Sequence, residues 1–161
     1  MLVTGAGGFI GTHVVESLVR LEADVRGFFR YTSTSNADRA DGVGAADVER
    51  IHGDLREPET VRRAVEGCDV VLHLGAEVAI PYSYRAPRQV VETNVLGTLN
   101  VLLAASDLVV ERVVCASTSE VYGQATELPI VETHPLLPQS PYAASKAGAD
   151  MLALAFHRSY G

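Results

Sequence analysis

The chain has 161 residues, a formal net charge of −7 and a pI of about 5.1, and 47% of its residues are apolar. This length and composition suit one globular domain with a hydrophobic core. The acidic balance disfavours general binding to nucleic acid, but a nucleotide can still be held by backbone amides. No apolar run has the length of a membrane span and no charged segment followed by an apolar one opens the chain. We therefore expect no membrane association and a cytoplasmic location.

Apolar segments of strand length alternate with segments of helical periodicity along the chain. The predicted strands are residues 1–4, 25–29, 48–52, 69–74 and 112–116. The predicted helices are residues 9–21, 58–65, 87–106 and 142–160, and residues 30–47 and 123–139 are predicted loops. The connections are too long for hairpins, so the pattern predicts an α/β fold. We expect a doubly wound, Rossmann-like parallel sheet that forms one dinucleotide-binding domain over residues 1–161.

A glycine turn joins the first predicted strand to the first helix, with glycine at positions 5, 8 and 11. Gly5 would provide backbone freedom, Gly8 close approach of a pyrophosphate, and Gly11 tight packing of the helix. The amides of Phe9 and Ile10 lie at the helix start, where they would face the phosphates. The alternative is a glycine-rich turn without a ligand, but the strand–turn–helix context favours a cofactor.

Residues at the ends of three other predicted strands are further candidates for cofactor binding. Arg30 stands where NAD binders usually carry an acidic residue, which favours NADP slightly, although a solvated surface arginine is equally compatible. Asp54, followed by Leu55, would either accept a bond from the adenine amino group or cap a turn. Gly75 and Ala76 are small enough for a ribose to approach the backbone.

Candidate catalytic residues follow the fifth predicted strand and open the last helix. The hydroxyl of Thr118 can bond a substrate oxygen and the carboxylate of Glu120 can act as a base, although such a strand end also forms ordinary turns. Tyr142 and Lys146 share one helix face, and a nearby ammonium favours the phenolate. Such a tyrosine can take a proton from a hydroxyl while hydride leaves the same carbon. Alone, this spacing is also common on ordinary helices.

No metal site is predicted, because the five histidines form no HxxxH or HExxH pattern and the two cysteines have no metal spacing. Cys68 and Cys115 are expected to be buried thiols without a disulfide in a reducing compartment. His73, inside a predicted strand, is expected to be a core residue with satisfied hydrogen bonds.

The order of these motifs, from the opening stretch Val3-Thr4-Gly5-Ala6-Gly7-Gly8-Phe9-Ile10-Gly11 to Tyr142-x-x-x-Lys146, resembles the extended short-chain dehydrogenase/reductase family, in its NAD-dependent epimerase/dehydratase branch. The resemblance spans essentially the whole chain. It implies that Tyr142 is the catalytic acid/base, that Lys146 holds the nicotinamide ribose, and that Thr118 contacts a sugar hydroxyl. It also implies an enzyme that oxidises C4 of a nucleotide-linked sugar with NAD or NADP.

Glu120 indicates which subgroup of that family the chain resembles most. Thr118-Ser119-Glu120 is similar to the Thr-Asp-Glu of dTDP-glucose 4,6-dehydratases, and the change to Ser119 leaves open which group protonates the departing hydroxyl. Thr-Ser-Glu also occurs in GDP-mannose 4,6-dehydratases and UDP-glucuronate decarboxylases, whereas 4-epimerases generally lack the Glu. The stretches 80–84, which includes Ser83, and 138–146 look most like UDP-N-acetylglucosamine 4,6-dehydratases. The resemblance thus implies 4,6-dehydration, with Glu120 removing the C5 proton, and with Ser83, Thr118 and Ser119 contacting substrate.

Two alternatives remain at this point. One is a 4-epimerase or decarboxylase of the same family, and the other is a dinucleotide-binding module without catalysis. The family continues beyond Gly161 with a strand and a region that grips the nucleotide-sugar. We therefore expect this chain to be truncated and, on its own, to bind cofactor without turnover. The family commonly dimerises through two long helices, here residues 87–106 and 142–160, so a homodimer is expected.

Overall fold

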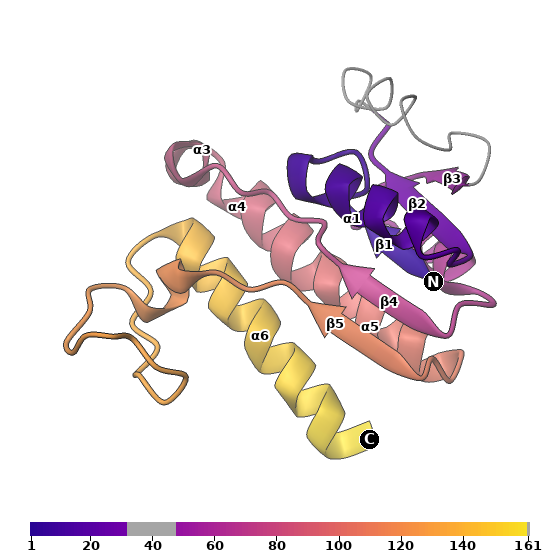
Figure 1. The fold of residues 1–161 in the computed structure, drawn as a ribbon. Coiled ribbons are helices and arrows are strands. Elements are labelled where there is room, and N and C mark those ends of the chain that lie inside the picture. The colour runs from indigo at the N-terminus through magenta and orange to yellow at the C-terminus, as the bar shows by residue number, and fades with distance from the viewer. Residues whose placement is uncertain (32–47, 161) are drawn as a thin grey trace.

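The computed structural model describes residues 1–31 and 48–160 (Figure 1). Its five strands pair in parallel in the order β3-β2-β1-β4-β5. They are β1 (Leu2–Thr4), β2 (Val25–Phe29), β3 (Val48–His52), β4 (Val70–His73) and β5 (Arg112–Cys115). The predicted parallel α/β sheet is confirmed. Its strand order reverses between β1 and β4, which is the place where open α/β sheets bind ligands.

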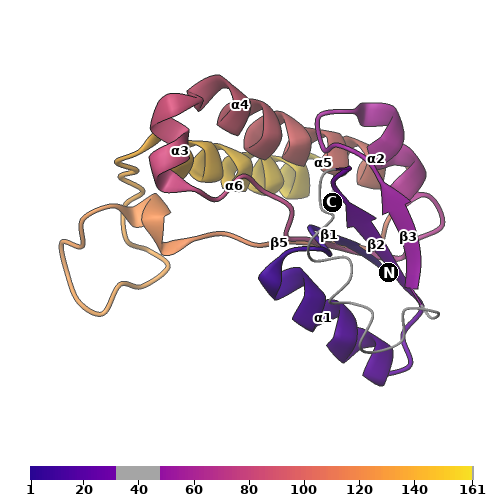
Figure 2. The ribbon, with the colours of Figure 1, turned by 90° about the horizontal axis from the view of Figure 1, so that it is seen from above.

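Helices cover both faces of the sheet (Figure 2). On one face, α1 (Phe9–Arg20) packs over a cluster that includes Val3 and Phe29. The other face carries α2 (Pro58–Val65) and α5 (Gly97–Asp107), over a cluster that includes Leu2 and Val71. Successive side chains of a strand point to opposite faces, so the neighbours Leu2 and Val3 each anchor a different core.

The prediction of one α-helix over residues 87–106 was wrong in detail. The segment consists of α4 (Pro87–Val91), a π-helical stretch η2 (Glu92–Leu96) and α5. Within η2 the side chain of Asn94 bonds to neighbouring segments, and its carbonyl accepts the Thr98 hydroxyl at 2.6 Å. These tertiary contacts hold a locally widened turn, a feature that is frequent at functional sites.

Two short elements were not predicted, namely α3 (Ile80–Arg85) and the 3₁₀ turn η3 (Ser119–Tyr122). The last helix, α6 (Pro141–Tyr160), begins one residue before its predicted start and packs beside α4, η2 and α5. Of the predicted loop over residues 30–47, positions 32–47 lie outside the described residues. None of the helices in the described part of the chain is long and apolar enough to cross a bilayer.

Both cysteines are free thiols, but only one has the predicted burial. Cys68 is buried in the core beneath α2. Cys115 is only half-buried, so that part of the prediction was wrong. It ends β5, which lies at the edge of the sheet and has a strand on only one side.

Replacement of Gly11 and Gly148 by alanine should have opposite effects, although both lie in helices. A Cβ at Gly11 would lie 2.1 Å from the Gly5 carbonyl oxygen, whereas one at Gly148 meets only a Val95 methyl at 3.5 Å. We expect Gly148→Ala to raise the free energy of unfolding by about 0.5–1 kcal/mol through helix propensity. Gly11→Ala should lower it by about 1–3 kcal/mol through overpacking. Urea denaturation measures both, and an unchanged Gly11→Ala midpoint would contradict the close contact.

Candidate active site

The glycine turn brings three backbone segments into close contact. Gly5 has φ +69°, in the region that glycine tolerates best, and a Cβ there would lie 2.9 Å from Gly75 Cα. On its other side, the Gly5 carbonyl oxygen accepts the amide of Gly8 at 2.9 Å and lies against Gly11. This geometry matches the backbone freedom predicted for Gly5 and the tight helix packing predicted for Gly11.

The start of α1 has the properties of an anion site. Its N-cap is Gly8, which provides no side-chain cap, and the first turn carries no acidic residue. Among the described residues no side chain caps the amides of this turn, and the helix dipole favours negative charge here. Phe9 and Ile10 are exposed here. These residues fit the pyrophosphate of a dinucleotide cofactor.

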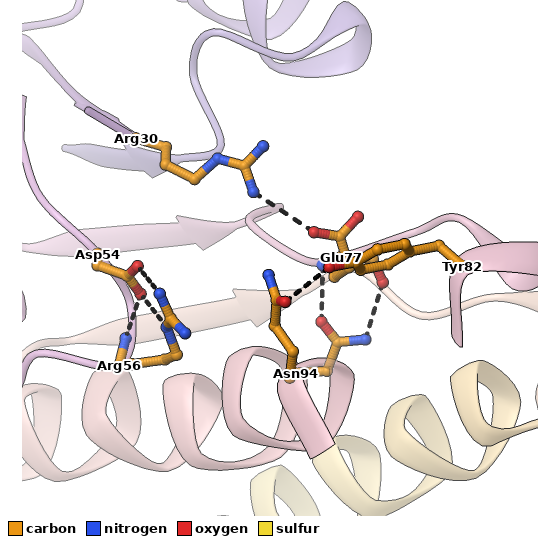
Figure 3. A network of polar contacts seen from close by, with 7 residues as sticks. Arg30, Asp54, Arg56, Glu77, Tyr82 and Asn94 are labelled. Carbon is orange, nitrogen blue, oxygen red and sulfur yellow. Dashed lines mark hydrogen bonds and ion pairs between the residues drawn. The ribbon is translucent and has the colours of Figure 1, made fainter. Parts of the chain in front are cut away.

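Charged residues surround the neighbouring strand ends (Figure 3). Arg30, directly after β2, reaches Glu77 after β4, with Nη1 3.4 Å from Oε2. Asp54, after β3, accepts bonds from the Arg56 backbone amide and guanidinium at 2.6–2.9 Å. The side-chain bond from Arg56 lowers the pKa of Asp54. Of the two roles considered for Asp54, this structure contains the turn cap, and the contact with adenine stays a prediction.

Gly75 and Ala76 are both half-buried just after the end of β4, whereas Leu55 is buried. Gly75 donates its amide to Thr4 Oγ1 at 3.0 Å, and Ala76 beside it is half-buried. Leu55 is buried, so close to Gly75 and Gly97 that a Cβ on either glycine would contact it. Its side chain therefore belongs to the core, and a cofactor would reach only its backbone.

Tyr142 and Lys146 are both buried on α6, each 8% exposed. Lys146 Nζ donates to the carbonyl oxygen of Ala116, just after β5, at 2.6 Å. Burial lowers the pKa of Lys146, while the charge of Asp150 opposes that shift. One turn further along α6, Asp150 accepts a hydrogen bond from the Ser117 hydroxyl. Two contacts from α6 thus fix the residues that lead into Thr118.

Thr118 caps the turn η3 by accepting the amide of Glu120 at 3.3 Å. The side chains of Ser119 and Glu120 are exposed, and Val121 is buried where η3 packs against α6. The structure therefore brings Thr118 and Glu120 to the same end of the sheet as Tyr142 and Lys146. Ser83, by contrast, is fully buried and donates to the Ile80 carbonyl oxygen at 2.7 Å, so contact with substrate would require a change of partner.

Asn94 is a residue of the site that the sequence analysis missed. Its Oδ1 accepts the Glu77 amide at 2.7 Å, and its Nδ2 donates to the Glu77 carbonyl oxygen at 3.0 Å (Figure 3). The same Nδ2 also donates to Ser145 Oγ at 2.9 Å. Ser145 in turn donates to the Tyr142 carbonyl oxygen. A signal was present, because Asn94 and Thr98 are polar residues at i, i+4 within an otherwise apolar helix face.

His73 is buried, as predicted, and both ring nitrogens are bonded. Nδ1 lies 2.7 Å from Thr4 Oγ1 and Nε2 lies 3.0 Å from Thr98 Oγ1. Burial lowers the pKa of His73 to about 3, so the ring is neutral at physiological pH. Within residues 1–31 and 48–160, no three His, Cys, Asp or Glu side chains form a group that could hold a metal ion.

Comparison with known proteins identifies the family. Residues 2–161 match the sequence model of the GDP-mannose 4,6-dehydratase family. The chain belongs to this family. It is therefore an extended short-chain dehydrogenase/reductase, as the order of its motifs predicted.

Similar proteins include dehydratases and epimerases. A dTDP-glucose 4,6-dehydratase of Streptomyces antibioticus is 39% identical over 100% of this chain and 50% of its own length. The structure of DesIV, a dTDP-glucose 4,6-dehydratase from Streptomyces venezuelae with NAD bound, has a TM-score of 0.92 and 41% identity over 99% of this chain and 52% of its own. The structure of a UDP-glucose 4-epimerase of Thermus thermophilus with NAD has a TM-score of 0.89 and 36% identity. The match covers 99% of this chain and 51% of the epimerase. The chain thus spans about half the length of these relatives.

Proposed function

We propose that the complete protein is a nucleotide-sugar 4,6-dehydratase. The observation that carries this proposal is the placement of Glu120. It is exposed on η3, two residues after the Thr118 cap and beside the helix that carries Tyr142 and Lys146. An enzyme that only inverts C4 needs no base at C5, so this extra carboxylate favours elimination over 4-epimerisation.

Each residue of the site has a proposed role. Thr118 bonds the C4 hydroxyl of the sugar, and Tyr142 removes its proton, helped by the positive charge of Lys146, which favours the phenolate. Glu120 then removes the C5 proton, which a C4 ketone makes acidic, and the C6 hydroxyl leaves with a proton as water. A bound nicotinamide dinucleotide would supply the hydride acceptor and donor, and Gly8, Phe9 and Ile10 would hold its pyrophosphate while Lys146 would hold its nicotinamide ribose.

The alternative functions, namely 4-epimerisation, decarboxylation and binding without catalysis, would use Glu120 and Lys146 differently. The Thermus relative shows that an epimerase shares this fold and over a third of the residues. A 4-epimerase would leave Glu120 without a C5 proton to remove. A decarboxylase, in which Thr-Ser-Glu also occurs, would be distinguished by a pentose product. A non-catalytic module would require neither Glu120 nor a lysine whose burial lowers its pKa beside Tyr142. We therefore keep dehydration as the main proposal.

Glu120→Gln should stop dehydration while leaving C4 oxidation in place. The amide has nearly the same shape but cannot accept the C5 proton, so we expect kcat for the 4-keto-6-deoxy product to fall by about 10²–10⁴. The assay incubates the complete protein with a panel of nucleotide-hexoses and resolves products by mass and NMR. Glu111→Gln, at the opposite end of β5, is the matched control. Unchanged dehydration in Glu120→Gln would refute the role of Glu120.

We propose NAD as the cofactor, in place of the slight preference for NADP that Arg30 suggested. Arg30 is already paired with Glu77, so a 2′-phosphate would have to displace a carboxylate and approach its charge. Glu77→Gln removes that charge and keeps the backbone bonds to Asn94. We expect tighter binding of NAD than NADP by the wild type, and a ratio shifted toward NADP by several-fold in Glu77→Gln. Wild-type preference for NADP in titration calorimetry would overturn this proposal.

The partners of the protein are also proposed. UDP-N-acetylglucosamine is the substrate that the residues around Ser83 suggest, whereas the dehydratases compared above are named for dTDP-glucose. We further propose a cytoplasmic homodimer, because Cys68 and Cys115 are free thiols and the two long helical segments expose apolar side chains. These side chains are Val91, Leu96, Leu103, Met151 and Leu154. Sedimentation of the complete protein should give a dimer, and a monomer at micromolar concentration would contradict this.

A further inference from the structure

A continuous set of hydrogen bonds crosses the core beneath the candidate site, and His73 is at its centre. The Gly75 amide donates to Thr4 Oγ1 at 3.0 Å, and Thr4 lies 2.7 Å from one nitrogen of the His73 ring. The other nitrogen lies 3.0 Å from Thr98 Oγ1. These side chains are all buried, and the proposed chemistry uses none of them.

The directions of these bonds follow from the number of hydrogens available. The Thr98 hydroxyl donates its one hydrogen to the Asn94 carbonyl oxygen at 2.6 Å, so it can only accept from His73. His73 Nε2 therefore carries the hydrogen and Nδ1 is an acceptor, which receives the hydroxyl of Thr4. Thr4 in turn accepts the Gly75 amide, so every group in the set is satisfied.

The two ends of this set lie at the two halves of the site. Gly75 touches Gly5, whose turn leads into the anion site at the start of α1. Asn94, at the other end, holds Glu77 and Ser145, and Ser145 donates to the Tyr142 carbonyl oxygen at 2.7 Å. A single imidazole thus joins the cofactor turn to the helix that carries the candidate acid/base.

We propose that His73 is a positioning residue that holds the cofactor turn in register with the catalytic helix. Its bond to Thr4 fixes the position of Gly75, and its bond to Thr98 fixes the π-helical segment around Asn94. The simpler alternative is a histidine that only fills space in the core. Both explanations include the same two hydrogen bonds of His73. Only the positioning role predicts that loss of the Thr4 bond affects cofactor binding and that loss of the Thr98 bond affects turnover. The part of the proposal that concerns turnover rests on the proposed dehydratase activity, whereas the part that concerns cofactor binding does not.

Two substitutions of His73 separate its two contacts. An asparagine amide lies near the position of Nδ1 and can keep the Thr4 contact, whereas the longer glutamine reaches the position of Nε2 and can keep the Thr98 contact. The complete protein is assayed for NAD affinity and for kcat at saturating NAD. For His73→Gln we expect NAD binding about tenfold weaker with kcat within about threefold, since one buried hydrogen bond is lost at the cofactor side. For His73→Asn we expect the reverse, with kcat about tenfold lower.

The matched pair Thr4→Val and Thr98→Val removes the same two contacts from the other side and preserves side-chain shape. Each variant also removes the bond that continues the set, from Gly75 to Thr4 or from Thr98 to Asn94. If a histidine variant fails to fold, this pair provides the test, with Thr4→Val expected to weaken NAD binding and Thr98→Val to lower kcat. A role limited to filling the core predicts lower melting temperatures with wild-type NAD affinity and kcat in the folded protein. That result, or the same defect in both members of a pair, would overturn the inference.

The two proposals fail in different ways. If the product is a C4 epimer, the dehydratase proposal is wrong, and the split between NAD affinity and kcat can still be measured on the epimerase reaction. If dehydration is observed without that split, the dehydratase proposal stands and the inference about His73 is wrong.

Discussion

Three hydrogen bonds of the buried Asn94 amide hold together the segments on which the site depends. They join the strand end at Glu77, the π-helical segment η2 and the last helix at Ser145. Buried amides are costly to leave unpaired, so movement of either the Glu77 segment or the Ser145 helix away from η2 must break a bond to Asn94. The cofactor side and the catalytic side of the site are consequently one rigid arrangement. The catalytic helix has its own attachment as well, through Lys146 to Ala116 and Asp150 to Ser117.

Local electrostatics, and not the overall charge, equips this acidic protein for an anionic ligand. The net charge of −7 would repel a nucleotide at long range. At the start of α1, however, the field comes from backbone amides and no acidic residue lies in the first turn. Asp54 and Glu77, the carboxylates nearest the strand ends, are each paired with an arginine. The negative charges of Asp54 and Glu77 are thus held by partners within the chain.

Much of the fold could be predicted because it depends on local signals. Apolar strands, the glycine spacing and a proline at the start of α2 are readable in sequence, and each of these elements was placed within two residues. The π-helical segment was not predicted, because it depends on Asn94 meeting Glu77 and Ser145, which are 17 and 51 residues away. The helix α3 was not predicted either, because its six residues are too few to show helical periodicity.

For the site, the order of motifs predicted which residues would meet, and their family, but it could not predict backbone partners. The sequence does not indicate that Lys146 donates to the Ala116 carbonyl oxygen. It also does not indicate that the Arg56 guanidinium donates to Asp54. Arg30 was correctly placed at a strand end, but its pairing with Glu77 depends on the reversal of strand order between β1 and β4. Contacts of this kind arise from the tertiary fold.

The most direct test of the central claim follows one hydrogen of the substrate. The complete protein is incubated with a nucleotide-hexose that carries deuterium at C4, and the product is examined by NMR. Oxidation at C4 followed by elimination and reduction predicts a 4-keto-6-deoxy sugar with the deuterium at C6. Deuterium found again at C4 of an epimer would contradict the assignment of Glu120 as the base and the dehydratase function with it.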